Sequence, residues 1–115
     1  MEVAPGRWLP LNPETIEALP DAPGVFEIAT LVRNVVQIGA GDGSLRQRIQ
    51  CLGGMPTHLP ACVGGYYVRF ELTPSEEQAL EARLGDYRRR HAGTLPPGNR
   101  HDAGPLPLRA ARRAA

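Results

Sequence analysis

The chain has no lysine, little cysteine and few aromatic residues. All thirteen of its basic side chains are arginine. Its two cysteines, Cys51 and Cys62, are too few for a disulfide framework, and they form no C-x-x-C pair or His–Cys cluster of the kind that binds zinc. We therefore expect both to be small buried side chains in a reducing cytoplasm.

Long apolar segments are also missing. No run approaches the roughly twenty residues that cross a membrane. The first ten residues, MEVAPGRWLP, lack the apolar segment that defines a signal peptide. The sequence therefore predicts a cytoplasmic protein with no membrane partner.

Charge is nearly balanced overall but unevenly distributed. The formal net charge is +1. From Ala82 onward there are eight arginines and only two acidic residues, whereas the preceding part has five arginines and ten acidic residues. Such a basic end is typical of polyanion-binding chains, and arginine pairs well with phosphate. The absence of lysine by itself is better explained by a GC-rich coding bias than by phosphate binding.

The chain length and the distribution of turn residues along it indicate one small domain followed by a tail. A chain of 115 residues suits a single domain with a modest core. Residues 101–115 contain too little apolar surface to order themselves, so we expect a basic disordered tail after a domain at residues 1–100.

Local signals predict the order (α)-β-β-α-β-α. Asn12-Pro13-Glu14 is typical of a helix start, and Ser44-Leu45-Arg46-Gln47 has the form of a capping box. Thr73-Pro74-Ser75-Glu76 indicates a further helix start, with Thr73 as the cap and Glu76 closing the box. The expected helices span residues 13–19, 44–52 and 73–91, and the expected strands span 24–30, 34–38 and 66–72.

The turn at residues 31–34 is too short for a crossover, so the first two strands should form an antiparallel hairpin. We therefore predict an α+β fold with a small three-stranded antiparallel sheet flanked by helices.

The stretch VVQIGAGDG at residues 35–43 has the strand–glycine turn–helix form of many nucleotide sites. It lacks the third glycine of the G-x-G-x-x-G fingerprint and the acidic residue expected about twenty positions later. It also looks like the first motif of methyltransferases that use S-adenosylmethionine, which would require a parallel sheet. The alternative is steric, with Gly39, Gly41 and Gly43 only turning the chain from strand into helix.

Residues 19–99 resemble the GIY-YIG nuclease domain. Leu19 to Phe26 (LPDAPGVF) is similar to the lead-in and first motif, and Val36-Gln37-Ile38-Gly39 takes the place of the second. The matches that follow are the arginine helix SLRQRI, the glutamate helix ALEARL and the closing segment PPGN. The resemblance covers about eighty residues in the right order, and it implies the same small antiparallel sheet that the local signals predict.

The resemblance implies metal-dependent hydrolysis of a DNA phosphodiester bond. By position, Arg48 would steady the phosphate charge, Glu81 would bind Mg²⁺ or Mn²⁺, and Asn99 would be the supporting asparagine. Such chemistry needs a metal to neutralise oxygen charge and a cation aimed at the transition state. Because the turn before the arginine helix is about one residue longer than usual, Arg46 is a rival to Arg48.

The chain departs from the family at both motif tyrosines. Phe26 replaces the first and lacks its hydroxyl, and Gln37 replaces the second with an amide that cannot act as a base. General acid–base help contributes about 10²–10⁴ in rate, so its loss should weaken or abolish cleavage. Gly39 stands at the last position of the degenerate second motif.

The candidate charges each have a structural alternative. Two features favour a ligand role for Glu81: it has no basic residue three or four positions away, and a helical wheel puts it at the edge of the apolar stripe. The structural alternative is that Glu81, like most helical glutamates, is a solvated surface charge. Arg88, Arg89 and Arg90 would suit a helix C-terminus, but together with Arg46 they could also bind nucleic acid. Three hypotheses result: a weakened nuclease, a non-enzymatic module that binds nucleic acid or protein on the same fold, and a cofactor binder built on the glycine turn.

Overall fold

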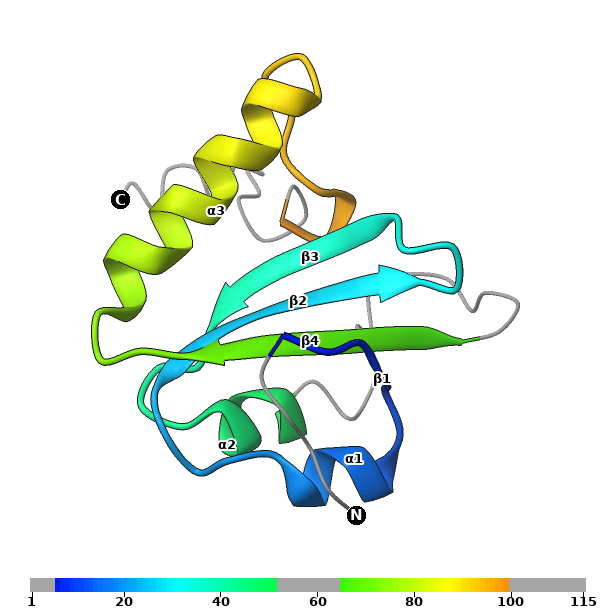
Figure 1. Cartoon of the computed structure of the whole chain (residues 1–115), viewed down its shortest axis with the longest axis vertical. Coiled ribbons are helices and arrows are strands. Elements are labelled where there is room, and N and C mark those ends of the chain that lie inside the picture. The colour runs from blue at the N-terminus through cyan, green and yellow to red at the C-terminus, as the bar shows by residue number, and fades with distance from the viewer. Residues whose placement is uncertain (1–5, 52–64, 100–115) are drawn as a thin grey trace, which may run out of the picture.

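The computed structural model describes residues 6–51 and 65–99 (Figure 1). The predicted tail, the end of the 44–52 helix beyond Cys51, and Cys62 lie outside the described residues. Cys51 is exposed, so the prediction that it is buried is wrong. None of the helices in the described part is long and apolar enough to cross a membrane.

The fold is α+β, with a four-stranded antiparallel sheet in the order β1-β4-β2-β3. The elements in chain order are β1 Leu9–Pro10, α1 Pro13–Ala18, β2 Gly24–Thr30, β3 Val35–Ala40, α2 Leu45–Gln50, β4 Tyr66–Leu72 and α3 Glu76–Arg90. The predicted order is confirmed, and β2 and β3 form the expected antiparallel hairpin.

The prediction of a three-stranded sheet is wrong by one strand. Leu9 and Pro10 pair with Val68 and Tyr67 of β4 and form the additional strand β1. Two residues are too few to show the alternation by which a strand is recognised. Proline lacks an N–H group, and it is tolerated here because β1 lies at the edge of the sheet.

The helices cover both faces of the sheet. In Figure 1, α1 and α2 lie below the strands and α3 crosses above them. The main core lies on the α1–α2 side, where Phe26 and Ile28 of β2 pack with Leu45 and Ile49 of α2. Leu45 and Ile49 lie four positions apart on one side of α2, and both are fully buried. Because β2 is central and covered on both sides, its first six residues are all buried.

Two of the three predicted helix caps are confirmed. Asn12 accepts a hydrogen bond from the Thr15 amide at 2.8 Å, and Ser44 accepts one from the Gln47 amide at 3.2 Å. The third prediction is wrong, because α3 begins at Glu76 with Ser75 as its cap residue, and no side chain caps it. The Glu76 carboxylate reaches away from its own helix to another part of the chain.

Candidate functional site

The glycine turn binds a carboxylate of the protein itself. Glu76 accepts a hydrogen bond from the Gly24 amide at 2.9 Å and also from the Gly43 amide, at 3.1 and 3.2 Å to its two oxygens. Backbone amides at such a turn are the groups that would hold a ligand phosphate. Here they are occupied by Glu76, and the sheet is antiparallel. The methyltransferase and cofactor-binder hypotheses, which require a parallel sheet, are therefore wrong.

The two motif positions that replace tyrosines are buried. The Phe26 ring is 1% exposed and lies against Gly39, where an added Cβ atom would be 2.6 Å from the ring. Gln37 is 2% exposed, and its Oε1 atom has no hydrogen-bond partner. Neither side chain offers a hydroxyl group or a base to a substrate.

Asn99 binds the edge strand β3. Its Oδ1 atom accepts from the Ile38 amide at 2.8 Å, and its Nδ2 atom donates to the Ile38 carbonyl at 2.7 Å. The side chain thereby pairs with both backbone groups that an additional strand would otherwise use. Asn99 thus supports the second motif strand without contacting a reactive group.

The predicted arginine and glutamate lie on opposite faces of the sheet. Arg48 is exposed on α2 and Glu81 is exposed on α3 (Figure 1). The rival Arg46 forms an ion pair with Asp21 at 3.8 Å on the α2 side. The structure does not gather the predicted site residues into one hollow, and Glu81 has the exposure of a solvated surface charge.

The donor set does not fit a resident metal ion. Within residues 6–51 and 65–99 there is no group of three or more His, Cys, Asp or Glu side chains that could hold one. Glu81 is therefore an exposed carboxylate that belongs to no such group. Mg²⁺ usually keeps several waters and is bound through one or two carboxylates together with substrate phosphates.

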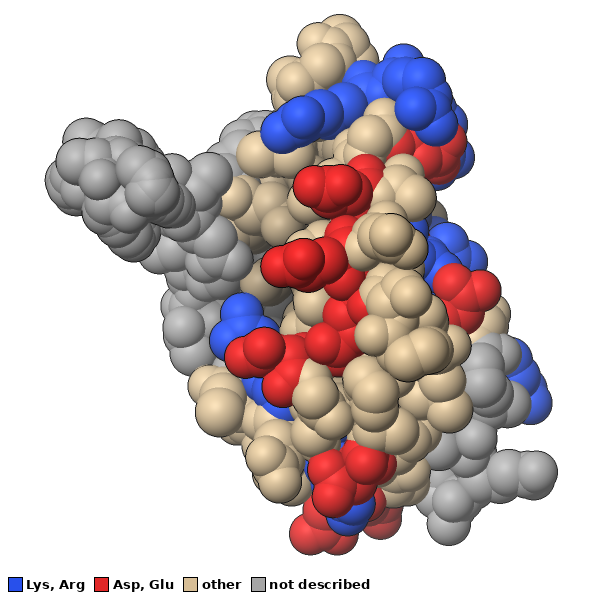
Figure 2. All heavy atoms as spheres, turned by 90° about the vertical axis from the view of Figure 1, so that its left-hand side faces the viewer, with Lys and Arg blue, Asp and Glu red and all other residues tan. Residues whose placement is uncertain are grey.

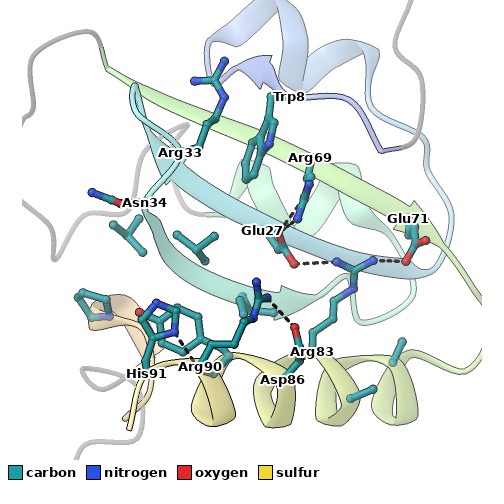
Figure 3. Close-up of a pocket in the computed structure, with 17 residues that line it drawn as sticks. Trp8, Glu27, Arg33, Asn34, Arg69, Glu71, Arg83, Asp86, Arg90 and His91 are labelled. Carbon is teal, nitrogen blue, oxygen red and sulfur yellow. Dashed lines mark hydrogen bonds and ion pairs between the residues drawn. The ribbon is translucent and has the colours of Figure 1, made fainter. Parts of the chain in front are cut away.

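A cleft lies instead between α3 and the adjacent face of the sheet, with a volume of about 950 Å³ (Figure 3). Four arginines and three acidic residues are among the side chains that line it, so it carries one surplus positive charge. The charged residues are Arg33, Arg69, Arg83, Arg90, Glu27, Glu71 and Asp86. Of the predicted nucleic-acid-binding residues, Arg90 is in this lining.

A buried ion network forms one end of the cleft. Glu27 is 7% exposed and accepts hydrogen bonds from Arg69 at 2.8 Å and from Arg83 at 2.7 Å. Arg83 also pairs with Glu71. Burial by itself lowers the pKa of Arg83, but the hydrogen bonds to Glu27 and Glu71 outweigh it and raise the pKa above its ordinary value. Arg83 therefore stays protonated, and its ion pairs with Glu27 and Glu71 join α3 to β2 and β4.

An arginine–aromatic ladder of Tyr67, Arg33, Trp8 and Arg69 runs along one side of the cleft, and all of its members except Tyr67 line the cleft. The Arg33 guanidinium lies 4.4 Å from the centroid of the Tyr67 ring and 5.8 Å from that of Trp8. Arg69 lies 4.6 Å from the same Trp8 ring. Arg33 donates to the Leu31 carbonyl and has no carboxylate partner in the described part of the chain. It is thus the cation of the cleft that is available to a ligand.

The C-terminal end of α3 forms the opposite wall. Asp86 pairs with Arg89 at 3.2 Å and with Arg90 at 2.5 Å. The His91 ring stacks on the Tyr87 ring with centroids 3.8 Å apart and planes 9° apart. Figure 2 shows acidic side chains along the outer side of α3 and basic ones gathered at its end.

Sequence reasoning missed most of this cleft. Trp8, Arg33, Arg69 and His91 lie far apart in the chain, and no spacing links them. The available signal is the alternation in β4, which places Tyr67 and Arg69 on the face away from the core residues Val68 and Phe70. That alternation predicts which face of the sheet the two side chains occupy. It does not predict which residues of other elements lie beside them.

Comparisons with known proteins identify a family but no function. No curated protein and no solved structure matches the chain. Residues 1–90 match a family described as "Domain of unknown function (DUF7508)". Because the match spans most of the chain, this protein belongs to the DUF7508 family.

Proposed function

We propose that this chain is a GIY-YIG-like domain that binds nucleic acid, most simply DNA, through the arginine-lined cleft and without cleaving it. The proposal takes its fold from the sequence resemblance. It takes its activity from the second of the three hypotheses, the non-enzymatic binding module. A cytoplasmic location is part of the same proposal.

Three features support the likeness to the GIY-YIG domain. The elements follow the family order, with an antiparallel hairpin before α2 and a helix after the last strand. Gly39 packs against Phe26, as the two motif strands require for close pairing. Asn99 supports the second motif strand through two hydrogen bonds. The last two features concern residues that the resemblance singled out.

The cleft is the observation that carries the binding proposal. It combines cations with exposed aromatic surface, the two features by which proteins bind nucleic acid without reading sequence. Within residues 6–51 and 65–99, no carboxylate pairs with Arg33 and competes with a phosphate. The basic last turn of α3, with Arg88, Arg89 and Arg90, extends the positive surface from the cleft.

The same geometry favours binding over hydrolysis. The Phe26 ring and the Gln37 amide are buried, so neither could activate a water molecule. Glu81 and Arg48 project from opposite faces of the sheet. The chain therefore lacks both motif tyrosines, and its candidate arginine and glutamate do not share a reaction centre.

Binding is tested by fluorescence anisotropy with a labelled DNA oligonucleotide at several salt concentrations. Affinity should fall steeply with salt, because arginine–phosphate contacts release counterions. Arg33→Gln should make the slope of log K against log salt shallower by about one. Arg7→Gln is the matched control, since Arg7 is exposed and does not line the cleft. An equal loss in the control would refute the assignment to the cleft.

Cleavage is tested by incubating the protein with supercoiled plasmid and either Mg²⁺ or Mn²⁺. We expect no nicking above the protein-free background. Metal-dependent nicking that disappears in both Glu81→Ala and Arg48→Ala would overturn the non-cleaving proposal in favour of a weakened nuclease.

A further inference from the structure

The two walls of the cleft both carry flat side chains. One wall carries Trp8 with the Arg33 guanidinium beside its ring, and the other carries the stacked pair of Tyr87 and His91 (Figure 3). His91 is exposed, and because Tyr87 covers one side of its ring, the other side is free to stack. The cleft is therefore shaped for planar groups as well as for charge.

The space between these walls has an apolar side. Val35, Val36 and Ile38 of β3 line the cleft between the ladder and the end of α3. A phosphate gains nothing from such a surface, whereas a nucleobase has apolar faces and polar edges. The Asn34 side chain at the rim offers both a donor and an acceptor to such an edge.

Arg33 adds an independent observation. Its backbone has φ = 69°, a left-handed conformation that is unfavourable for a residue with a side chain and is usual for glycine. The hairpin thus holds an arginine where glycine would be less strained. Strain of this kind gathers at binding sites, where a side chain must be held in place.

From this geometry we infer that the cleft accepts the unstacked bases of single-stranded nucleic acid, with a base between the Trp8 ladder and His91 and a backbone phosphate on Arg33. This inference rests on the proposed function and narrows its partner. In a duplex the base faces are stacked and the edges are paired, so only phosphates and groove edges could meet the cleft. A single strand can splay its bases onto aromatic and guanidinium planes.

Trp8 is the single tryptophan of the chain, so its fluorescence reports directly on the cleft. The protein is titrated with a ten-nucleotide oligothymidylate, with a duplex of the same length, and with an abasic strand of the same charge. We expect the single strand to quench Trp8 and to bind at least fivefold more tightly than the abasic strand. Fivefold corresponds to about 1 kcal/mol, the lower end for one stacked base.

His91→Ala separates stacking from charge. It should remove most of the advantage of the base-bearing strand over the abasic strand and leave abasic binding unchanged. A merely structural role of His91 would instead lower both affinities together with the thermal midpoint.

The outcomes distinguish the two proposals. If duplex, single strand and abasic strand bind equally and leave Trp8 emission unchanged, the single-strand inference is overturned while nucleic-acid binding stands. If none of the three binds at low salt, the proposed function itself is overturned.

Discussion

The bond between Glu76 and the glycine turn makes a sharp prediction about stability. Its carboxylate accepts from the amides of Gly24 and Gly43, which lie 52 and 33 residues away in the chain. It therefore joins the start of α3 to the start of β2 and to the turn before α2. Hydrogen bonds to charged groups contribute about 1.5–3 kcal/mol each, and the partly exposed Gly43 bond belongs at the lower end.

Glu76→Ala should accordingly lower the free energy of unfolding by about 2–4 kcal/mol. Glu76→Gln keeps one acceptor oxygen and should lose about 1–2 kcal/mol. Glu77→Gln is the matched control, because Glu77 lies in the same first turn and is exposed. It changes the same charge near the helix dipole and should cost no more than about 0.5 kcal/mol.

Urea unfolding followed by far-ultraviolet circular dichroism measures these differences at a constant m-value. A second measurement tests whether Glu76→Ala leaves the amides of Gly24 and Gly43 unpaired. Added phosphate should stabilise Glu76→Ala more than the wild type, since an anion can replace the carboxylate and ligands stabilise the state they bind. Equal unfolding free energies for the Glu76 and Glu77 variants would refute the reasoning.

Three further substitutions test the packing of the fold by the same assay. Gly24→Ala should destabilise by about 1–3 kcal/mol, because its Cβ atom would lie 2.3 Å from a backbone oxygen of β4, and a wild-type-like midpoint would disprove this contact. Gly85→Ala should stabilise by about 1 kcal/mol, because it lies inside α3 and an added Cβ atom would make an ordinary contact of 3.8 Å with the Arg89 side chain, and a loss of stability would contradict that geometry. Asn99→Ala should cost about 1–3 kcal/mol through the two unpaired groups of Ile38. Amide exchange at Ile38 that does not accelerate in this variant would speak against the clamp.

Local chemistry in the sequence was sufficient for most of the elements. The caps Asn12 and Ser44 act within three residues of themselves, so their sequence context determines them. The apolar positions Leu45 and Ile49 recur at helical spacing, and they are buried. The four-residue turn between the first two strands required an antiparallel hairpin, and it formed even without glycine because Arg33 takes the positive φ.

The pairing of distant groups was decided only by the tertiary structure. Glu76 has the spacing of a local cap, but the amides of the glycine turn lie close to it in space and compete for its carboxylate. Strand β1 exists because the folded β4 offers a free edge, which two residues of sequence could not indicate.

The cleft and the separation of Arg48 from Glu81 have the same origin. Periodicity assigns a side chain to one face of its own helix or strand, but it does not say which face of the sheet a helix will cover. Packing placed α2 and α3 on opposite faces, and thereby separated the residues that the motif order had grouped. It also assembled Trp8, Arg33 and His91, which no spacing connects, because the sheet brings its strand ends and the end of α3 to one surface.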